Sequence, residues 1–186
     1  MSTRGIYGFH KNGEDKLTYN HFDSYPEGLG KNITDCLLNL KLKIKNKFIP
    51  TLNKVFDNIV MVEEKTSVPK NLEINEFDWY TYLRSNQGDL NYLIDKYFNN
   101  EECYMINNKD FIKDSLFCEF GYIINLDTKK FEIYKGGQEQ PTSKHRYYVD
   151  EPTTILKLGN NFYNCELIKE YSLTKIPKEW YKNYDK

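Results

Sequence analysis

Side chains that could do chemistry are densest between residues 3 and 30. Arg4 lies close to the amino terminus, and residues 19–26 read Tyr-Asn-His-Phe-Asp-Ser-Tyr-Pro. At the end of a strand such side chains can converge on a pocket, where an amide donates, an imidazole acts as acid or base, and a carboxylate orients it. We therefore expect the functional site in this segment. The candidate binding residues are Arg4, Tyr19, Asn20, His21, Asp23, Ser24 and Tyr25.

The same segment also fits a structural interpretation. Aspartate and serine are common turn residues, because their side chains bond to backbone groups a few positions away. On this interpretation Asp23 and Ser24 form a polar turn and cap the helix that follows. The sequence leaves both interpretations open.

Other reactive sites are poorly represented in the sequence. The histidines at positions 10, 21 and 145 form no short-spaced ligand pair, and no cysteine belongs to a Cys-x-x-Cys motif. A metal site would require these histidines to converge with Asp23 in the folded chain. The Gly-x-Ser-x-Gly signature of serine hydrolases is missing. We expect no metal, no cofactor and no committed catalytic residue.

Charge composition argues against binding of duplex nucleic acid. The chain has 26 Lys and Arg residues against 27 Asp and Glu residues, with only three arginines among them. The lysines at 41, 43, 45 and 47 fan around the solvated side of a helix, so we do not interpret them as a nucleic-acid patch. Tyr147 and Tyr148, beside Lys144 and Arg146, could stack on single-stranded RNA. A half-buried strand explains this cluster equally well, and we favour the strand.

Cysteine spacing and hydropathy indicate the cellular setting. The widely spaced cysteines give no secreted disulfide framework, and the first residues contain no apolar signal segment. We expect a cytoplasmic protein, located in the host cell if a phage encodes it, with no membrane partner.

The first half of the chain predicts a hairpin and then helices. Residues 4–9 and 16–21 read as antiparallel strands, because Asn12-Gly13 between them supplies positive φ angles. Apolar spacing predicts a helix over 32–48 that Pro50 ends, and a second segment over 52–62 that is helical at first. Two short helices are expected over 73–86 and 89–98, separated by Gly88.

The second half predicts mainly strands. Residues 117–126 and 131–134 form a second hairpin, in which the first strand is buried on both faces and the second is half exposed. Further strands are expected at 146–149, 154–158 and 162–167. The order predicts a single α+β domain with a mainly antiparallel sheet and a helical insert. Its parts are an N-terminal hairpin (3–22), a helical region (31–99) and a C-terminal β region (116–176).

Two blocks of the sequence resemble a known family. Thr3-Arg-Gly, then residues 19–26 and Gly28-Leu-Gly30, look like an uncharacterised family of small proteins from bacteria and prophages. Residues 118–127 and 131–134 are similar to the second block of that family. The two blocks cover roughly a quarter of the chain. The resemblance implies kinship and transfers no activity.

The opening hairpin is also similar to that of N-terminal-nucleophile hydrolases, including glutamine amidotransferases and linear-amide hydrolases. That resemblance implies an amino-terminal nucleophile with its own α-amine as base. After removal of Met1, Ser2 would be the nucleophile, with Asn20 as hydrogen-bond partner and Asp23 as orienting group. The sequence departs from these enzymes, because Arg4 stands where amidotransferases carry Cys and Tyr19 where linear-amide hydrolases place Arg.

These observations favour binding over catalysis. The leading hypothesis is a non-catalytic, inhibitory accessory protein of a phage or other mobile element. It would antagonise a host defence system by binding a host protein or sequestering a small ligand. The alternatives are an amidohydrolase that uses Ser2 and an accessory protein that binds RNA or single strands.

Overall fold

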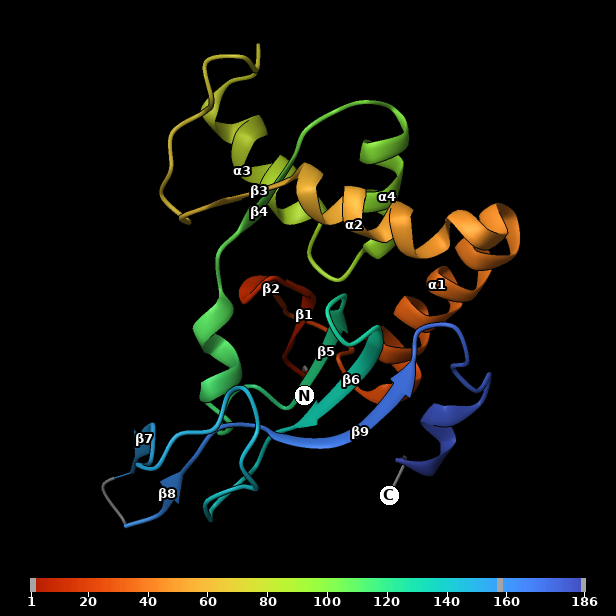
Figure 1. Ribbon diagram of the computed structural model, residues 1–186. Helices are drawn as coiled ribbons and strands as arrows, with labels where there is room; N and C mark the ends of the chain where they lie inside the picture. Colours follow the sequence, from red (N-terminus) through yellow and green to blue (C-terminus); the bar gives the residue numbers. More distant parts are fainter. Residues whose placement is uncertain (1–2, 157–158, 185–186) are drawn as a thin grey trace.

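A five-stranded mixed sheet lies at the centre of the computed structural model, which describes residues 3–156 and 159–184 (Figure 1). In spatial order its strands are β2 (Glu14–Asn20), β1 (Gly5–Lys11), β5 (Phe120–Asn125), β6 (Lys130–Lys135) and β9 (Glu166–Ser172). Only β1 and β5 are parallel neighbours, from Gly5 opposite Phe120 to His10 opposite Asn125. The expected α+β class with a mainly antiparallel sheet is confirmed.

Both predicted hairpins form. Strands β1 and β2 pair over their whole length and turn at Asn12 and Gly13, whose φ angles are 51° and 75°. Positive φ at both turn residues matches the right-handed twist of the strands, which is why Asn-Gly is favoured there. Strands β5 and β6 pair from Phe120 opposite Lys135 to Asn125 opposite Lys130.

The position of β5 is as predicted, but that of β6 is not. Strand β5 lies in the middle of the sheet and is largely buried. Strand β6 was expected to expose Glu132 and Tyr134, and both are buried, at 3% and 1% exposure. The segment after β6 folds back over them and places Arg146 on Glu132 and Tyr147 against Tyr134. Alternation in a strand does not reveal a later loop that covers its polar face.

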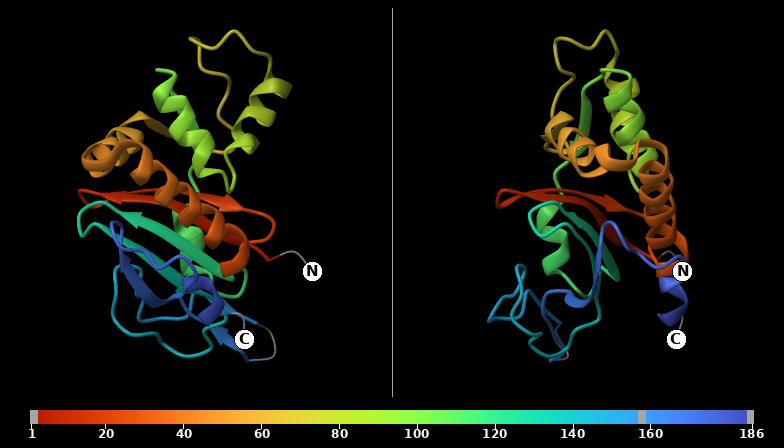
Figure 2. Two further views of the ribbon diagram at one scale, coloured as in Figure 1. Left: turned by 90° about the vertical axis from the view of Figure 1, so that its right-hand side faces the viewer. Right: turned by 45° about the vertical axis from the view of Figure 1, so that its right-hand side comes forward.

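Helices α1 (Lys31–Ile44) and α2 (Phe48–Asn58) cover one face of the sheet (Figure 2). The helix predicted over 32–48 ends instead at Ile44, followed by the short η2 (Lys45–Lys47) in which Lys45 has a φ of 50°. Pro50 was expected to stop this helix and lies in the first turn of α2. Proline is tolerated there because first-turn N–H groups have no partner within a helix.

The alternating lysines at 41, 43, 45 and 47 were predicted to lie on the solvated side of a helix. Lys43, Lys45 and Lys47 are exposed, and Lys41 is half buried. The Lys41 Nζ donates to the backbone oxygen of Thr174 at 2.6 Å. Three of the four are therefore solvated, although Lys45 and Lys47 lie in η2 and not on the predicted helix.

A smaller parallel pair of strands lies beside the helices. Strand β3 (Ile59–Val62) follows α2 directly and pairs with β4 (Cys103–Ile106). The segment predicted over 52–62 as helical at first is helical to Asn58 and then forms this strand. Helices α3 (Glu76–Ser85) and α4 (Leu90–Phe98) lie between β3 and β4 in sequence, separated near Gly88 as predicted. A separate apolar cluster joins α3 to β4.

The C-terminal part contains less strand than predicted. Residues 146–149 form a turn, in which the Tyr148 N–H donates to the His145 oxygen at 3.0 Å, so the predicted strand there is wrong. Strand β7 (Thr154–Ile155) pairs with β8 (Asn161–Phe162), and residues 157–158 of the predicted strand lie outside the described part. The remaining short helical turns are η1 (Pro26–Gly30), η3 (Lys109–Lys113) and η4 (Trp180–Asn183).

The two faces of the sheet carry different cores. The larger core packs Tyr7, Phe9, Tyr122 and Phe131 against α1, α2 and Trp180. The smaller core lies on the opposite face and is closed by η3 and the segments around Tyr147 and Cys165. No helix among the described residues is long and apolar enough to cross a membrane.

Trp180 should be a major contributor to stability. It is 1% exposed, its ring centre lies 5.8 Å from that of Phe131, and its Nε1 donates to Thr34 Oγ1 at 3.0 Å. We expect Trp180→Ala to lower the free energy of unfolding by about 3–5 kcal/mol in urea denaturation. The control Phe77→Ala, at a ring that is 77% exposed, should change it by less than about 0.5 kcal/mol. Equal losses in the two variants would contradict this packing.

Candidate functional site

The predicted site residues lie at the end of the sheet where β1 begins and β2 ends, and two of them are buried. Asn20 is 8% and Ser24 is 0% exposed. The Asn20 amide donates to Ser24 Oγ at 2.7 Å and to the Phe22 oxygen. The Ser24 oxygen accepts from the Tyr122 hydroxyl at 2.9 Å, and its N–H donates to the Thr3 oxygen at 3.1 Å. Asn20 and Ser24 therefore fasten this turn to β1 and β5.

Asp23 and Tyr25 lie on the outside of the same turn. Asp23 has a φ of 52°, and its backbone oxygen accepts from Leu29 N–H at 2.8 Å. A Cβ at Gly28 would come within 2.2 Å of that oxygen, so the turn requires glycine there. The side chains of Asp23 and Tyr25 are exposed. No side chain caps α1, so the predicted capping role of Asp23 and Ser24 is wrong although the polar turn itself is present.

Arg4, Tyr19 and His21 belong to a partly exposed group of rings and cations at this end of the sheet. The Tyr19 hydroxyl lies 2.6 Å from His21 Nδ1, and the Tyr19 ring packs edge-on against Phe111. The Arg4 guanidinium lies 4.8 Å from the ring centre of Phe117, which is 40% exposed. We call this group, with the additions below, the arginine–aromatic surface. It comprises Arg4, Tyr19, His21, Phe22, Tyr80, Arg84, Phe111 and Phe117.

Arg84 extends this surface from α3. Its guanidinium lies 4.7 Å from the ring centre of Tyr80, which is 47% exposed. Burial raises the pKa of Tyr19, and the charges of Arg4 and Arg84 act against that rise. Both cations therefore lie within electrostatic reach of Tyr19. Among residues 3–156 and 159–184 the ion pairs include neither guanidinium.

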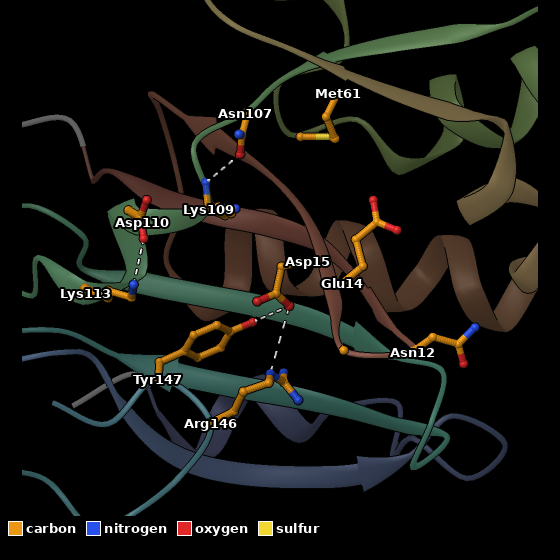
Figure 3. Close-up of a pocket in the computed structure, with 11 residues that line it drawn as sticks. Asn12, Glu14, Asp15, Met61, Asn107, Lys109, Asp110, Lys113, Arg146 and Tyr147 are labelled. Atoms are coloured by element: carbon orange, nitrogen blue, oxygen red, sulfur yellow. Dashed lines mark hydrogen bonds and ion pairs between the residues drawn. The ribbon is translucent and has the colours of Figure 1, made fainter.

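A polar cleft at the other end of the hairpin is a second candidate, which the sequence did not predict (Figure 3). It has a volume of about 510 Å³ and lies between the hairpin tip, β3, the segment around η3, and the turn at 146–147. None of the seven predicted binding residues lines it. Its polar lining includes Glu14, Asp15, Lys109, Arg146 and Tyr147.

The floor of this cleft is a network of paired charges. Asp15 Oδ1 lies 2.7 Å from His10 Nδ1 and accepts from the Tyr147 hydroxyl at 2.9 Å. The Arg146 guanidinium donates to both carboxylate oxygens of Glu132, whose side chain is 4% exposed. The same carboxylate accepts from Asn125 Nδ2 at 2.6 Å and from the Tyr134 hydroxyl at 3.0 Å. Buried charges are tolerated only with this degree of pairing.

The network suits binding better than nucleophilic catalysis. Burial and the Asp15 carboxylate raise the pKa of Tyr147, so its hydroxyl stays protonated and donates to Asp15. No Ser, Thr or Cys is among the residues that line the cleft. The sequence hid this site because Asp15, Glu132 and Arg146 are brought together only by the pairing of β1 with β5 and the return of the chain after β6.

Models of protein families, curated proteins and solved structures contain no match to this chain. Within the described residues, no three His, Cys, Asp or Glu side chains are grouped as a metal site would require. The four cysteines are buried and unpaired by disulfides. Ser2, the nucleophile of the hydrolase alternative, lies outside the described residues.

Because the Asn20 amide holds the turn, its replacement should destabilise the fold. Asn20→Asp replaces an amide donor by oxygens that face the oxygens of Ser24 and Phe22. We expect it to lower the free energy of unfolding by about 1–3 kcal/mol. His21→Asn, at an exposed neighbour, is the control and should have a smaller effect in the same urea denaturation. If Asn20→Asp leaves stability unchanged, Asn20 does not hold the turn.

The lowered pKa of His145 should make the fold less stable in acid. Burial lowers the pKa of His145 below its ordinary value of 6.5, and the neighbouring Arg146 charge adds to that effect. Below pH 6.5 the unfolded chain therefore binds a proton that the folded chain does not, and the free energy of unfolding falls as the pH falls. Urea denaturation between about pH 7.5 and about pH 5 should give a smaller fall for His145→Gln than for the unmodified chain. Identical slopes would contradict the prediction.

Proposed function

We propose that this chain is a non-catalytic binding protein that attaches to an acidic surface of a partner protein through the arginine–aromatic surface. One observation carries the proposal: Arg4 and Arg84 each lie on an exposed ring and neither belongs to an ion pair of the described residues. A guanidinium held on a ring is preorganised to bind a carboxylate through two hydrogen bonds. Arginine and tyrosine are also the residue types that dominate interface energies.

The charge distribution supports a protein partner over a single-stranded nucleic acid. Bases stack on open ring faces, whereas guanidinium groups lie over the rings of Phe117 and Tyr80. The whole chain has a formal net charge of −1, which gives little general attraction to polyanions. Two guanidiniums without a counterion among the described residues fit a discrete acidic patch better.

The hydrogen bonds that Asn20 already makes at the same end of the sheet favour binding over hydrolysis. An N-terminal-nucleophile enzyme uses an asparagine amide to stabilise the oxyanion. The Asn20 amide already donates to Ser24 and to the Phe22 oxygen. Its oxygen also faces Gly88, where a Cβ would come within 2.4 Å. The Ser2 amidohydrolase is kept as the alternative.

The biological setting is proposed from the sequence. The two blocks that resemble a prophage family support an origin in a phage or mobile element. A small binding protein of that origin is suited to block a component of a host defence system, and an acidic surface on that component is the binding site we propose.

The test is capture of a partner from a nuclease-treated bacterial lysate by the tagged chain. We expect a discrete protein to bind the unmodified chain. We also expect the double variant Arg4→Gln, Arg84→Gln to retain it at least about tenfold less, because two interface arginines are removed. The control Lys129→Gln, Lys135→Gln removes equal charge from the β5–β6 hairpin and should retain the partner.

Two results would contradict the proposal. One is equal capture by the double arginine variant and the control. The other is release of ammonia from glutamine by the unmodified chain that Ser2→Ala abolishes, which would establish the hydrolase alternative. A partner that is captured only without nuclease treatment would favour the nucleic-acid alternative.

A further inference from the structure

The polar cleft has the size and construction of a small-ligand site. Its volume of about 510 Å³ falls within the range of roughly 300–1,000 Å³ that is usual for such sites. Its walls come from distant parts of the chain: residues 12–15, Met61, residues 107–113, and Arg146 with Tyr147. Met61 at one edge and Tyr147 beside Asp15 supply apolar surface (Figure 3).

Most charges around the cleft already have partners. Arg146 is paired with Glu132, and Lys113 Nζ lies 2.7 Å from Asp110 Oδ1. Asp15 Oδ1 is engaged by His10 and Tyr147. A ligand that displaced these pairs would leave a charge without its counterion, which is costly where the charge is buried.

Two charged side chains of opposite sign at the cleft have no counterion among the described residues. Glu14 and Lys109 form no ion pair with any residue that the structure describes, and they come from different walls of the cleft. Asp15 Oδ2 also accepts no hydrogen bond from the described residues, but the Asp15 side chain extends from β2 in the direction opposite to that of Glu14 (Figure 3). Figure 3 shows Glu14 on one side of Asp15, and Lys109 and Lys113 on the other.

We propose that this cleft binds a small zwitterion, a free amino acid or a short peptide. Its ammonium group lies at Glu14, and its carboxylate lies at Lys109. A ligand with one charge of each sign satisfies both free groups without breaking a native pair. The lining supports no net excess of either sign, since Lys109, Lys113 and Arg146 balance Glu14, Asp15 and Asp110. The proposal does not depend on the arginine–aromatic surface, although η3 contributes Phe111 to that surface and Lys109 and Lys113 to the cleft.

Calorimetric titration with defined probes tests this site. The twenty amino acids and alanyl-alanine are titrated first. The best of them is then compared with its N-acetylated form, which lacks the ammonium charge, and its carboxamide, which lacks the carboxylate. We expect both blocked forms to bind about fivefold more weakly or worse. Glu14→Gln should weaken the zwitterion and abolish discrimination against the N-acetylated form, and Lys109→Met should abolish discrimination against the amide.

Matched variants separate the site from general charge effects. Glu139→Gln and Lys135→Met remove exposed charges outside the cleft and should bind the zwitterion as the unmodified chain does. The proposal is overturned if no amino acid or dipeptide binds at millimolar concentration, or if the blocked forms bind equally well. Binding of inorganic phosphate alone that depends on Lys109 would also overturn it, because it would define an anion site.

Discussion

The parallel pairing of β1 with β5 is the constraint on which the rest of the structure depends. It joins the N-terminal hairpin to the C-terminal hairpin across more than a hundred residues of sequence, with Gly5 opposite Phe120 and His10 opposite Asn125. At the first end it sets Arg4 beside Phe117 and Glu119, and at the second it sets His10 and Asp15 near Asp127 and Arg146. Because β1 has neighbours on both edges and cores on both faces, its ends are held firmly enough to position both groups (Figure 1).

Charged side chains are paired and buried at one end of this strand pair, and they lie unpaired against rings at the other. The carboxylate of Glu132 is buried, and every charge beside it is matched by a counterion or a hydrogen bond, as the cost of desolvation requires. Arg4 and Arg84 instead remain at the surface and lie against rings, which hold the guanidiniums without neutralising them. The first arrangement lines a preformed cleft, and the second leaves two guanidiniums without a counterion among the described residues. Both suit binding, and neither presents an activated nucleophile among the described residues.

Local sequence signals were sufficient to predict the hairpins. The features that they did not predict depend on packing between segments that are farther apart in the sequence. Asn12-Gly13 was sufficient for the first turn because its φ preference is set within two residues. Pro50 was misread because proline marks either a helix end or a first turn, and the choice depended on the left-handed Lys45 before it. Burial of Glu132 depends on the return of the chain at Arg146 and Tyr147, which the alternation of residues within β6 does not reveal. The segment 3–30 was a sound place to look, but its buried members Asn20 and Ser24 serve the turn while Arg4, Tyr19 and His21 remain on the surface.

The central claim is that a partner protein binds at the Arg4 end of the sheet. Hydrogen–deuterium exchange of the chain, alone and saturated with the captured partner, tests this most directly because it reports on all segments at once. The account predicts slowed exchange in residues 19–25, 80–87 and 111–119, with little change in residues 12–15 and 144–148. Protection confined to residues 12–15 and 144–148, or no protection of the arginine–aromatic surface, would contradict this claim.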